Sequence, residues 1–462
     1  MTKKRAPLHL ILLFIHLIST SIYLNVEIVN NDMSTFLIAG QDILRGNLPY
    51  ENQFEIKGPV LYIMYAIFVW IASENILIIK YIISFLVYLI SYILFDTILD
   101  QTKNLKLSFL ASLIFLLLMS SKGLGQSGYS ELIALIFLSL GFKYFLKNEY
   151  NSQIILSGFL FGLSTLTSFG TIIFVPIITF FYFLDKSLNS LKVFLSGFFF
   201  PHIVFLLIYI SKSKFYLYKF ALFDLPIQYT TESYIQHNLH HYILMVTEEV
   251  KHLDILLMVT MLVVIYSILN NYKFLMLIFA SYFIFFISGS GAVHHLIFLV
   301  YLFCLSFMNI KYNLLENILL IPLIIVTLIF AFSFSGNAIS NYLNDGKFYE
   351  NYPIRNLADE LKNQTEDKNY TILAYENHLV LYYLNKPNLS YVIHPSLAVD
   401  KIANDSLKNY LNIDNSFKSL LDTKPKYIFC DKNLVSCNFD NYKEMIFSFN
   451  DDQISYFVLT NP

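Results

Sequence analysis

The chain has 462 residues, of which 56% are hydrophobic, 17% aromatic and only 14% charged, and its formal net charge is −2. A soluble domain carries roughly a quarter charged residues, so this composition excludes most soluble classes and indicates a polytopic membrane protein. The near-neutral charge leaves no basic surface for nucleic acid, and three cysteines are too few for a disulfide scaffold or a clustered thiolate metal site.

The N-terminus carries three basic residues, Lys3 to Arg5, before an apolar stretch without a small-residue cleavage signal. This pattern predicts a retained first helix whose N-terminus is cytoplasmic. Further apolar stretches predict spans near 76–98, 105–121, 131–147, 153–168, 171–184, 189–210, 252–269, 274–288, 293–309 and 313–332. We therefore predict about eleven spans in a membrane domain, 1–332, and a polar extracytoplasmic domain, 333–462.

The segment GPVLYIMYAIFVWIAS, 58–73, is short for a membrane span and follows a polar stretch. If it lies in the interface instead of crossing, most short loops that carry lysine fall on the same side as the basic N-terminus, as the positive-inside rule requires. We interpret 58–73 as an interfacial helix within a long external loop, 27–75.

The first loop reads NNDMSTFLIAGQDILRGNLPYENQFEIKGPVLY, 30–62. This loop combines three features in a specific order. They are an acidic residue soon after the first span, an AG-x3-L-x-GN-x-PY run, and an acidic residue two positions before Lys-Gly-Pro. The loop resembles the first extracytoplasmic loop of the GT-C superfamily, polytopic glycosyltransferases that move a sugar from a polyprenyl-phosphate carrier, although Lys-Pro-Pro is commoner there. The run GLGQSGYSELIAL, 123–135, is similar to the second external loop of the lipid A aminoarabinose transferases in that superfamily. The chain also resembles protein O-mannosyltransferase-like membrane enzymes.

Three residues of the first loop are candidate catalytic groups. Sugar transfer to a hydroxyl needs a base for the acceptor's proton and a cation for the departing phosphate. We predict that Asp32 is the base and Lys57 the phosphate partner, and that Glu55 orients Lys57 or binds a divalent cation. The alternatives are a helix-flanking Asp32, a lysine that reaches the membrane surface, and a plain Glu55 salt bridge.

Other external residues are candidate substrate-binding groups. Arg45 follows Asp42 by three residues and offers a second phosphate contact, with an exposed helix pair as the alternative. Tyr50 lies in a turn that faces the predicted site. The second loop contributes Gln126, Tyr129 and Glu131. Glu131 binds sugar or metal, or is simply a favourable acid at a helix N-terminus.

Histidines gather on the external side. The loop 211–251 holds His237, His240 and His241, and we assign the pair His294 and His295, which opens the tenth span, to substrate binding. His237 and His241 would share one face of a helix, as a metal pair needs, but no third ligand is evident. The metal site stays unassigned, and the cofactor expectation is limited to a possible divalent cation.

The tail alternates strand-like and helical pieces. Apolar segments at 370–375, 389–394, 425–430 and 454–459, with a helix near 353–363, predict a small α/β domain. Cys430 and Cys437 are either bridged or two free thiols, since an extracytoplasmic position permits a disulfide.

We predict a glycosyltransferase of the plasma (bacterial inner) membrane that moves a sugar from a polyprenyl-phosphate carrier to an envelope glycan, lipid or protein. The inverting mechanism and the donor class are what the GT-C resemblance implies. Two rivals remain. A transporter or flippase of lipid-linked sugars would carry paired polar groups inside the bundle. A polymerase or ligase of lipid-linked sugars would be expected to have arginine-rich external loops, where this chain has only Arg45 and Arg355.

Overall fold

The computed structural model describes residues 5–20, 27, 31–120, 124–147, 150–185, 187–228, 272–287, 293–309, 352–365, 369–432, 435, 437, 439–449 and 452–460. These residues form two compact units. The first comprises the described residues within 1–24, 80–205 and 232–348, and the second those within 25–79, 206–231 and 349–462. The domain boundary predicted near 332 lies outside the described residues and stays a prediction.

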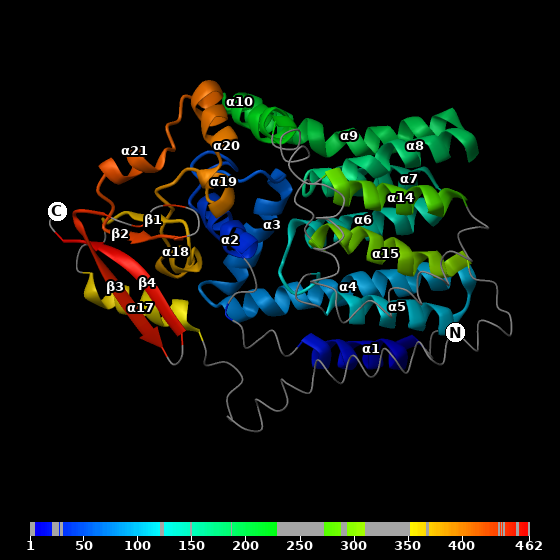
Figure 1. Ribbon diagram of the computed structural model, residues 1–462. Helices are drawn as coiled ribbons and strands as arrows, with labels where there is room; N and C mark the ends of the chain where they lie inside the picture. Colours follow the sequence, from blue (N-terminus) through cyan, green and yellow to red (C-terminus); the bar gives the residue numbers. More distant parts are fainter. Residues whose placement is uncertain are drawn as a thin grey trace. The chain divides into compact units, whose positions relative to one another are not determined.

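The first unit is a bundle of apolar helices. Figure 1 shows α4 to α9, α14 and α15 side by side with similar axis directions. Its elements are α1 (Arg5–Thr20), α4 (Ile76–Thr102), α5 (Leu105–Met119), α6 (Ser130–Lys147), α7 (Asn151–Thr165), η3 (Phe169–Ile173), α8 (Phe174–Asp185), α9 (Leu188–Ser211), α14 (Tyr272–Ile287), η5 (Val293–Leu296), α15 (Ile297–Leu305) and η6 (Ser306–Asn309). The ends of α4 and α9 extend into the second unit.

These helices fall where the apolar stretches predict them, including the break between α7 and α8. Within the described part of the chain, α4 and α9 are long and apolar enough to cross a membrane by length and composition, and several other apolar helices are shorter. The predicted spans 252–269 and 313–332 lie outside the described residues. The number of spans therefore stays a prediction.

Small residues bring α7 and α9 close together. A Cβ at Gly158 would stand 2.0 Å from the carbonyl oxygen of Phe194, and one at Gly197 would stand 2.1 Å from that of Ile155. Helix pairs in membranes use small residues in this way, because lipid supplies no hydrophobic force between helices and close backbone packing replaces it.

The second unit joins the first external loop to the tail. Its helical elements are α2 (Asn31–Leu44), α3 (Pro59–Ala72), α10 (Phe215–Lys219), η4 (Phe220–Asp224), α17 (Pro353–Gln364), α18 (Leu379–Leu384), α19 (Pro395–Val399), α20 (Lys401–Ser406), η7 (Leu407–Leu411) and α21 (Phe417–Asp422). The sequence did not predict α2, whereas α3 occupies the range of the predicted interfacial helix. Gly46, with φ +97°, ends α2 and donates its N–H to the carbonyl of Ile43.

A four-stranded mixed sheet of order β1-β2-β4-β3 forms the tail's centre. β1 (Ile372–Ala374) pairs in parallel with β2 (Tyr427–Phe429), which pairs antiparallel with β4 (Asp452–Leu459), and β4 forms a hairpin with β3 (Tyr442–Phe449). α17 packs against β3 and β4. Cys430 and Cys437 form a disulfide, so they are not two free thiols. The sequence missed β3.

The predicted strand 389–394 is wrong as a strand of this sheet. Its Val392 forms a single parallel bridge with Phe54 of the first external loop. The alternating apolar pattern records a half-buried extended segment, but its partner belongs to a distant part of the chain, which local periodicity cannot reveal.

Gly40 sets the contact between α2 and α3. A Cβ there would lie 2.8 Å from the backbone nitrogen of Ala66 and 2.8 Å from the backbone carbon of Tyr65. Because neither atom is the end of a flexible side chain, Gly40→Ala should lower the free energy of unfolding by about 1–3 kcal/mol. Thermal unfolding of the purified protein in lipid measures this, with Leu44→Ala as control, because Leu44 is an exposed residue of the same helix. Equal stability of both variants would contradict the prediction.

Candidate active site

The candidate base lies at the start of α2. Asp32 is in the first turn of that helix, where a negative charge is favourable. Its Oδ1 lies 2.8 Å from Nε2 of His394, and Nδ1 of the same imidazole lies 2.9 Å from Oγ of Ser396. Each ring nitrogen of His394 thus faces an oxygen that can accept a hydrogen bond, and the Ser396 hydroxyl can also donate one, so the arrangement accommodates both a protonated and a neutral ring.

Backbone contacts with the first loop place His394 beside Asp32. Phe54 donates its N–H to the carbonyl of Tyr391 at 2.7 Å and accepts from the N–H of Ile393 at 3.0 Å. Gln53 and Asn388 exchange two further hydrogen bonds, both of 3.0 Å. The segment that ends in His394 is therefore fixed to the loop that carries Glu55 and Lys57.

Two buried tyrosines hold the backbone around Lys57. Tyr50 donates its hydroxyl hydrogen to the Lys57 carbonyl at 2.5 Å, and Tyr62 donates to the Glu55 carbonyl at 2.8 Å. Their rings meet edge to face with centroids 5.6 Å apart. Tyr50 was predicted to bind substrate, but its side chain is fully buried, so in this structure it acts through the backbone of Lys57.

The charged groups of this cluster are electrostatically linked. Burial raises the pKa of Glu55, while His394 and Lys57 oppose the shift. Burial lowers the pKa of His394, but the charges of Glu55 and Asp32 outweigh it, so the net shift is upward. Glu55 is 3% exposed, and its Oε2 accepts no hydrogen bond from the described residues. Asp32, Glu55, Lys57 and His394 are thus close enough to influence one another's charge, and such a set of groups can offer both a base and positive charge.

Arg45 lies at the other end of α2. Thirteen residues separate it from Asp32, about 20 Å along a helix axis. Its Nη2 donates to Oδ1 of Asn385 at 2.9 Å, and its Nη1 lies 3.9 Å from Oδ1 of Asp42. Arg45 is exposed and Asp42 is buried, so this i,i+3 pair is exposed on the side of the arginine only. The structure does not bring Arg45 to Asp32.

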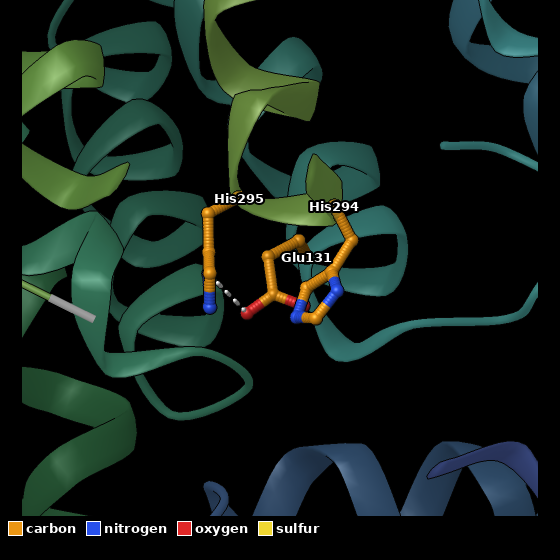
Figure 2. Close-up of side chains that lie close together, drawn as sticks. All are labelled: Glu131, His294 and His295. Carbon is orange, nitrogen blue, oxygen red and sulfur yellow. Dashed lines mark ion pairs between the residues drawn. The ribbon is translucent and has the colours of Figure 1, made fainter. Parts of the chain in front are cut away.

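A second cluster lies in the first unit, where the start of α6 meets η5. Figure 2 shows the side chains of His294 and His295 on either side of the Glu131 carboxylate. Nδ1 of His295 lies 3.4 Å from Oε1 of Glu131, and Nε2 of His294 lies 3.9 Å from Oε2. Ser130 and Ser168 each donate a hydroxyl hydrogen to this carboxylate.

This second cluster could hold a metal ion. Its three ligand atoms lie within 4.8 Å of one another, and a tetrahedral zinc separates its nitrogen and oxygen ligands by about 3.4 Å. Two imidazoles and one carboxylate are typical ligands of zinc and related transition metals. The ring of Tyr129 stacks on that of His294 with centroids 4.0 Å apart, which orients this imidazole. Gln126 is buried and donates to the carbonyl of Met119, while His237, His240 and His241 lie outside the described residues.

Comparison with known proteins identifies the fold. No family model matches the chain, and no curated protein matches its sequence. Among solved structures, ArnT from Cupriavidus metallidurans bound to undecaprenyl phosphate is 8% identical, with a TM-score of 0.66 over 99% of this chain and 98% of that one. The oligosaccharyltransferase AglB from Archaeoglobus fulgidus, in complex with an inhibitory peptide and a dolichol-phosphate, is 11% identical, with a TM-score of 0.53 over 91% and 69%. The Archaeoglobus fulgidus oligosaccharyltransferase in complex with Zn and sulfate is 12% identical, with a TM-score of 0.51 over 90% and 67%.

The chain therefore shares the fold of ArnT and of the AglB oligosaccharyltransferase. This confirms the fold that the first-loop resemblance implies, including a helical bundle and a C-terminal sheet.

The structure brings together Asp32, Glu55 and Lys57, the three residues that the first-loop motif groups. His394 is not predicted from the sequence. The only local signal was a histidine before Pro395 at the start of a helix, and nothing in that pattern points to residue 32.

Proposed function

We propose that this protein is a membrane glycosyltransferase that moves a sugar from a polyprenyl-phosphate carrier to an extracytoplasmic acceptor. The observation that carries the proposal is the electrostatic cluster of Asp32, Glu55, Lys57 and His394, in a chain with a GT-C-like fold. The bound undecaprenyl phosphate of ArnT and the dolichol-phosphate of AglB support a lipid-linked donor.

The proposed reaction is a single displacement with inversion at the anomeric carbon. Asp32 takes the proton of an acceptor hydroxyl, and the oxygen attacks the anomeric carbon as the bond to the phosphate oxygen breaks. The polyprenyl phosphate leaves with the electron pair of that bond, and the Lys57 ammonium stabilises its charge. His394 and Glu55 set the charge around both groups.

The proposed location is the plasma membrane, with a cytoplasmic N-terminus and with the loop 27–75 and the tail domain 333–462 outside. The contact between Asp32 of the first loop and His394 of the tail supports placing both segments on one side of the membrane. The acceptor is an envelope glycan, a lipid or a protein.

A transfer assay tests the function. Membranes that contain the native chain are supplied with a panel of radiolabelled polyprenyl-phosphate sugars, with nucleotide sugars as a parallel donor set. We expect label to pass to an acceptor from a lipid-linked donor and not from a nucleotide sugar. Movement of the intact labelled lipid across the bilayer, without transfer from any donor, would favour the transporter instead.

We further propose that Glu131, His294 and His295 hold a divalent cation such as zinc, which when bound would supply positive charge to substrate oxygens. Removing the one carboxylate ligand should weaken binding strongly, so we expect Glu131→Gln to lower zinc affinity by at least about tenfold. Zinc competition with a chromophoric chelator, on the purified protein, measures this. His202→Ala is the matched control, since His202 bonds to Thr165 in the same unit. A native chain that takes up no zinc at micromolar concentration would contradict the proposal.

A further inference from the structure

A pocket lies in the second unit, beside the C-terminal ends of α2 and α3. It has a volume of about 360 Å³, and its polar and aromatic lining comprises Gln41, Arg45, Trp70, Ser73, Glu74 and Asn385. Gln41 and Arg45 follow Asp32 by nine and thirteen residues, so the pocket is about 14–20 Å from the proposed base along α2. It is therefore distinct from the Asp32 cluster.

Gln41 contributes a buried amide to the wall of the pocket. Gln41 is 5% exposed, and its Nε2 donates to the carbonyl of Tyr382 at 2.9 Å, which fixes the orientation of the amide. Its Oε1 has almost no accessible surface, so a ligand would pack against this wall without bonding to that oxygen. The polar groups that remain for a ligand belong to Arg45, Ser73, Glu74 and Asn385.

The other residues that line the pocket offer the flat apolar face of an indole ring together with hydrogen-bond donors and acceptors. Trp70, the only tryptophan of the chain, is 73% exposed. The guanidinium of Arg45 is held by Asn385, and Glu74 pairs with Lys362 at 3.1 Å on the exposed side. An indole face with donors and acceptors around it matches a pyranose ring, which has an apolar face and a rim of hydroxyls.

Charge narrows the ligand class. Arg45 and Glu74 carry opposite charges, so the pocket has no net positive charge to favour a phosphate. A membrane surface would accommodate Trp70 and the exposed Ile67 and Ile71 beside it, but it would leave the polar lining of Arg45, Glu74 and Asn385 against lipid.

We propose that this pocket binds a neutral hexose or N-acetylhexosamine unit of a glycan. Binding stands on the pocket alone. Its assignment to the acceptor, at a position remote from the bond that forms, rests on the proposed glycosyltransferase function.

The single tryptophan makes binding directly measurable. The full chain is reconstituted into liposomes of phosphatidylethanolamine and phosphatidylglycerol, because detergents with sugar headgroups would compete. Methyl glycosides of glucose, galactose and N-acetylglucosamine are then titrated while tryptophan emission is recorded. We expect a saturable change in emission with at least one glycoside and none with sorbitol, which has similar hydroxyls but no ring face.

Variants locate the binding, with saturation-transfer NMR of the same glycoside as a readout that does not need Trp70. Trp70→Ala should weaken binding by about tenfold or more. Ile71→Ala, an exposed change on the same helix turn outside the pocket, should leave it unchanged. The Asp32→Asn chain should bind as the native chain does, whether or not it transfers sugar, which separates this inference from the proposed reaction.

Two results would overturn the inference. One is the absence of saturable glycoside binding to a correctly folded chain. The other is strong quenching of Trp70 by brominated lipids that glycosides do not relieve, which would make this face a membrane anchor.

Discussion

Asp32→Asn should lower the rate of sugar transfer by about 10²–10⁴-fold, the usual contribution of a general base. An asparagine oxygen still accepts a hydrogen bond from His394, so the loop geometry should persist, but the amide cannot take a proton. The measurement is the initial rate of transfer from the labelled donor that the panel identifies.

Asp42→Asn is the matched control for this variant. Asp42 lies on the same helix and is buried, with Asn47 and Arg45 as its partners, and it takes no part in the Asp32 cluster. We expect it to change the rate by only a few-fold at most. If Asp32→Asn left transfer intact, the base would have to be Glu55 or Glu131.

The sequence predicts the helical fold because each membrane helix is a local signal. About 20 apolar residues in a row suffice to identify a candidate span, whatever the span later packs against. The helix α2 was missed for the opposite reason. Its residues are buried within the compact second unit and include Gln41 and Asp42, so they show no plain apolar run.

The candidate site was only partly predictable from the sequence. Residues that are close together along the chain could be grouped, and residues that are far apart could not. Asp32, Glu55 and Lys57 lie within one motif, so a single loop groups them. His394 reaches Asp32 through backbone pairing between Phe54 and the segment around Val392, which follows from tertiary contacts alone. The same holds for Glu131 and the two histidines of η5, which were each assigned to substrate binding but not joined into one cluster.

His394→Gln should move the acidic limb of the pH–rate profile to lower pH by more than one unit. At a pH where His394 of the native chain is mostly protonated, this shift is worth about tenfold in the relative rate. Burial lowers the pKa of His394, but Glu55 and Asp32 raise it above the ordinary value of 6.5, and Lys57 opposes them. His378 is a further neighbour, but burial lowers its pKa to about 3, so it stays neutral. While His394 is protonated, its charge reduces the proton affinity of Asp32. Transfer by the native chain should therefore rise with pH through an apparent pKa above 6.5 that belongs to the pair.

Without the imidazole, that limb should reflect the carboxylate alone, and the maximum rate should fall because Asp32 loses its fixed partner. The ion pair's contribution to stability has the matching sign. It is present below the unfolded pKa of histidine and is lost as pH rises through the folded pKa, so His394→Gln should lower the thermal midpoint more at pH 6 than at pH 9. Ser396→Ala is the control, since it keeps the contact between His394 and Asp32 and should leave the limb in place. If His394→Gln left the acidic limb unchanged while Asp32→Asn was inactive, Asp32 would act as the base without the charge of His394. A shifted limb would make the tail domain part of the proposed catalytic machinery.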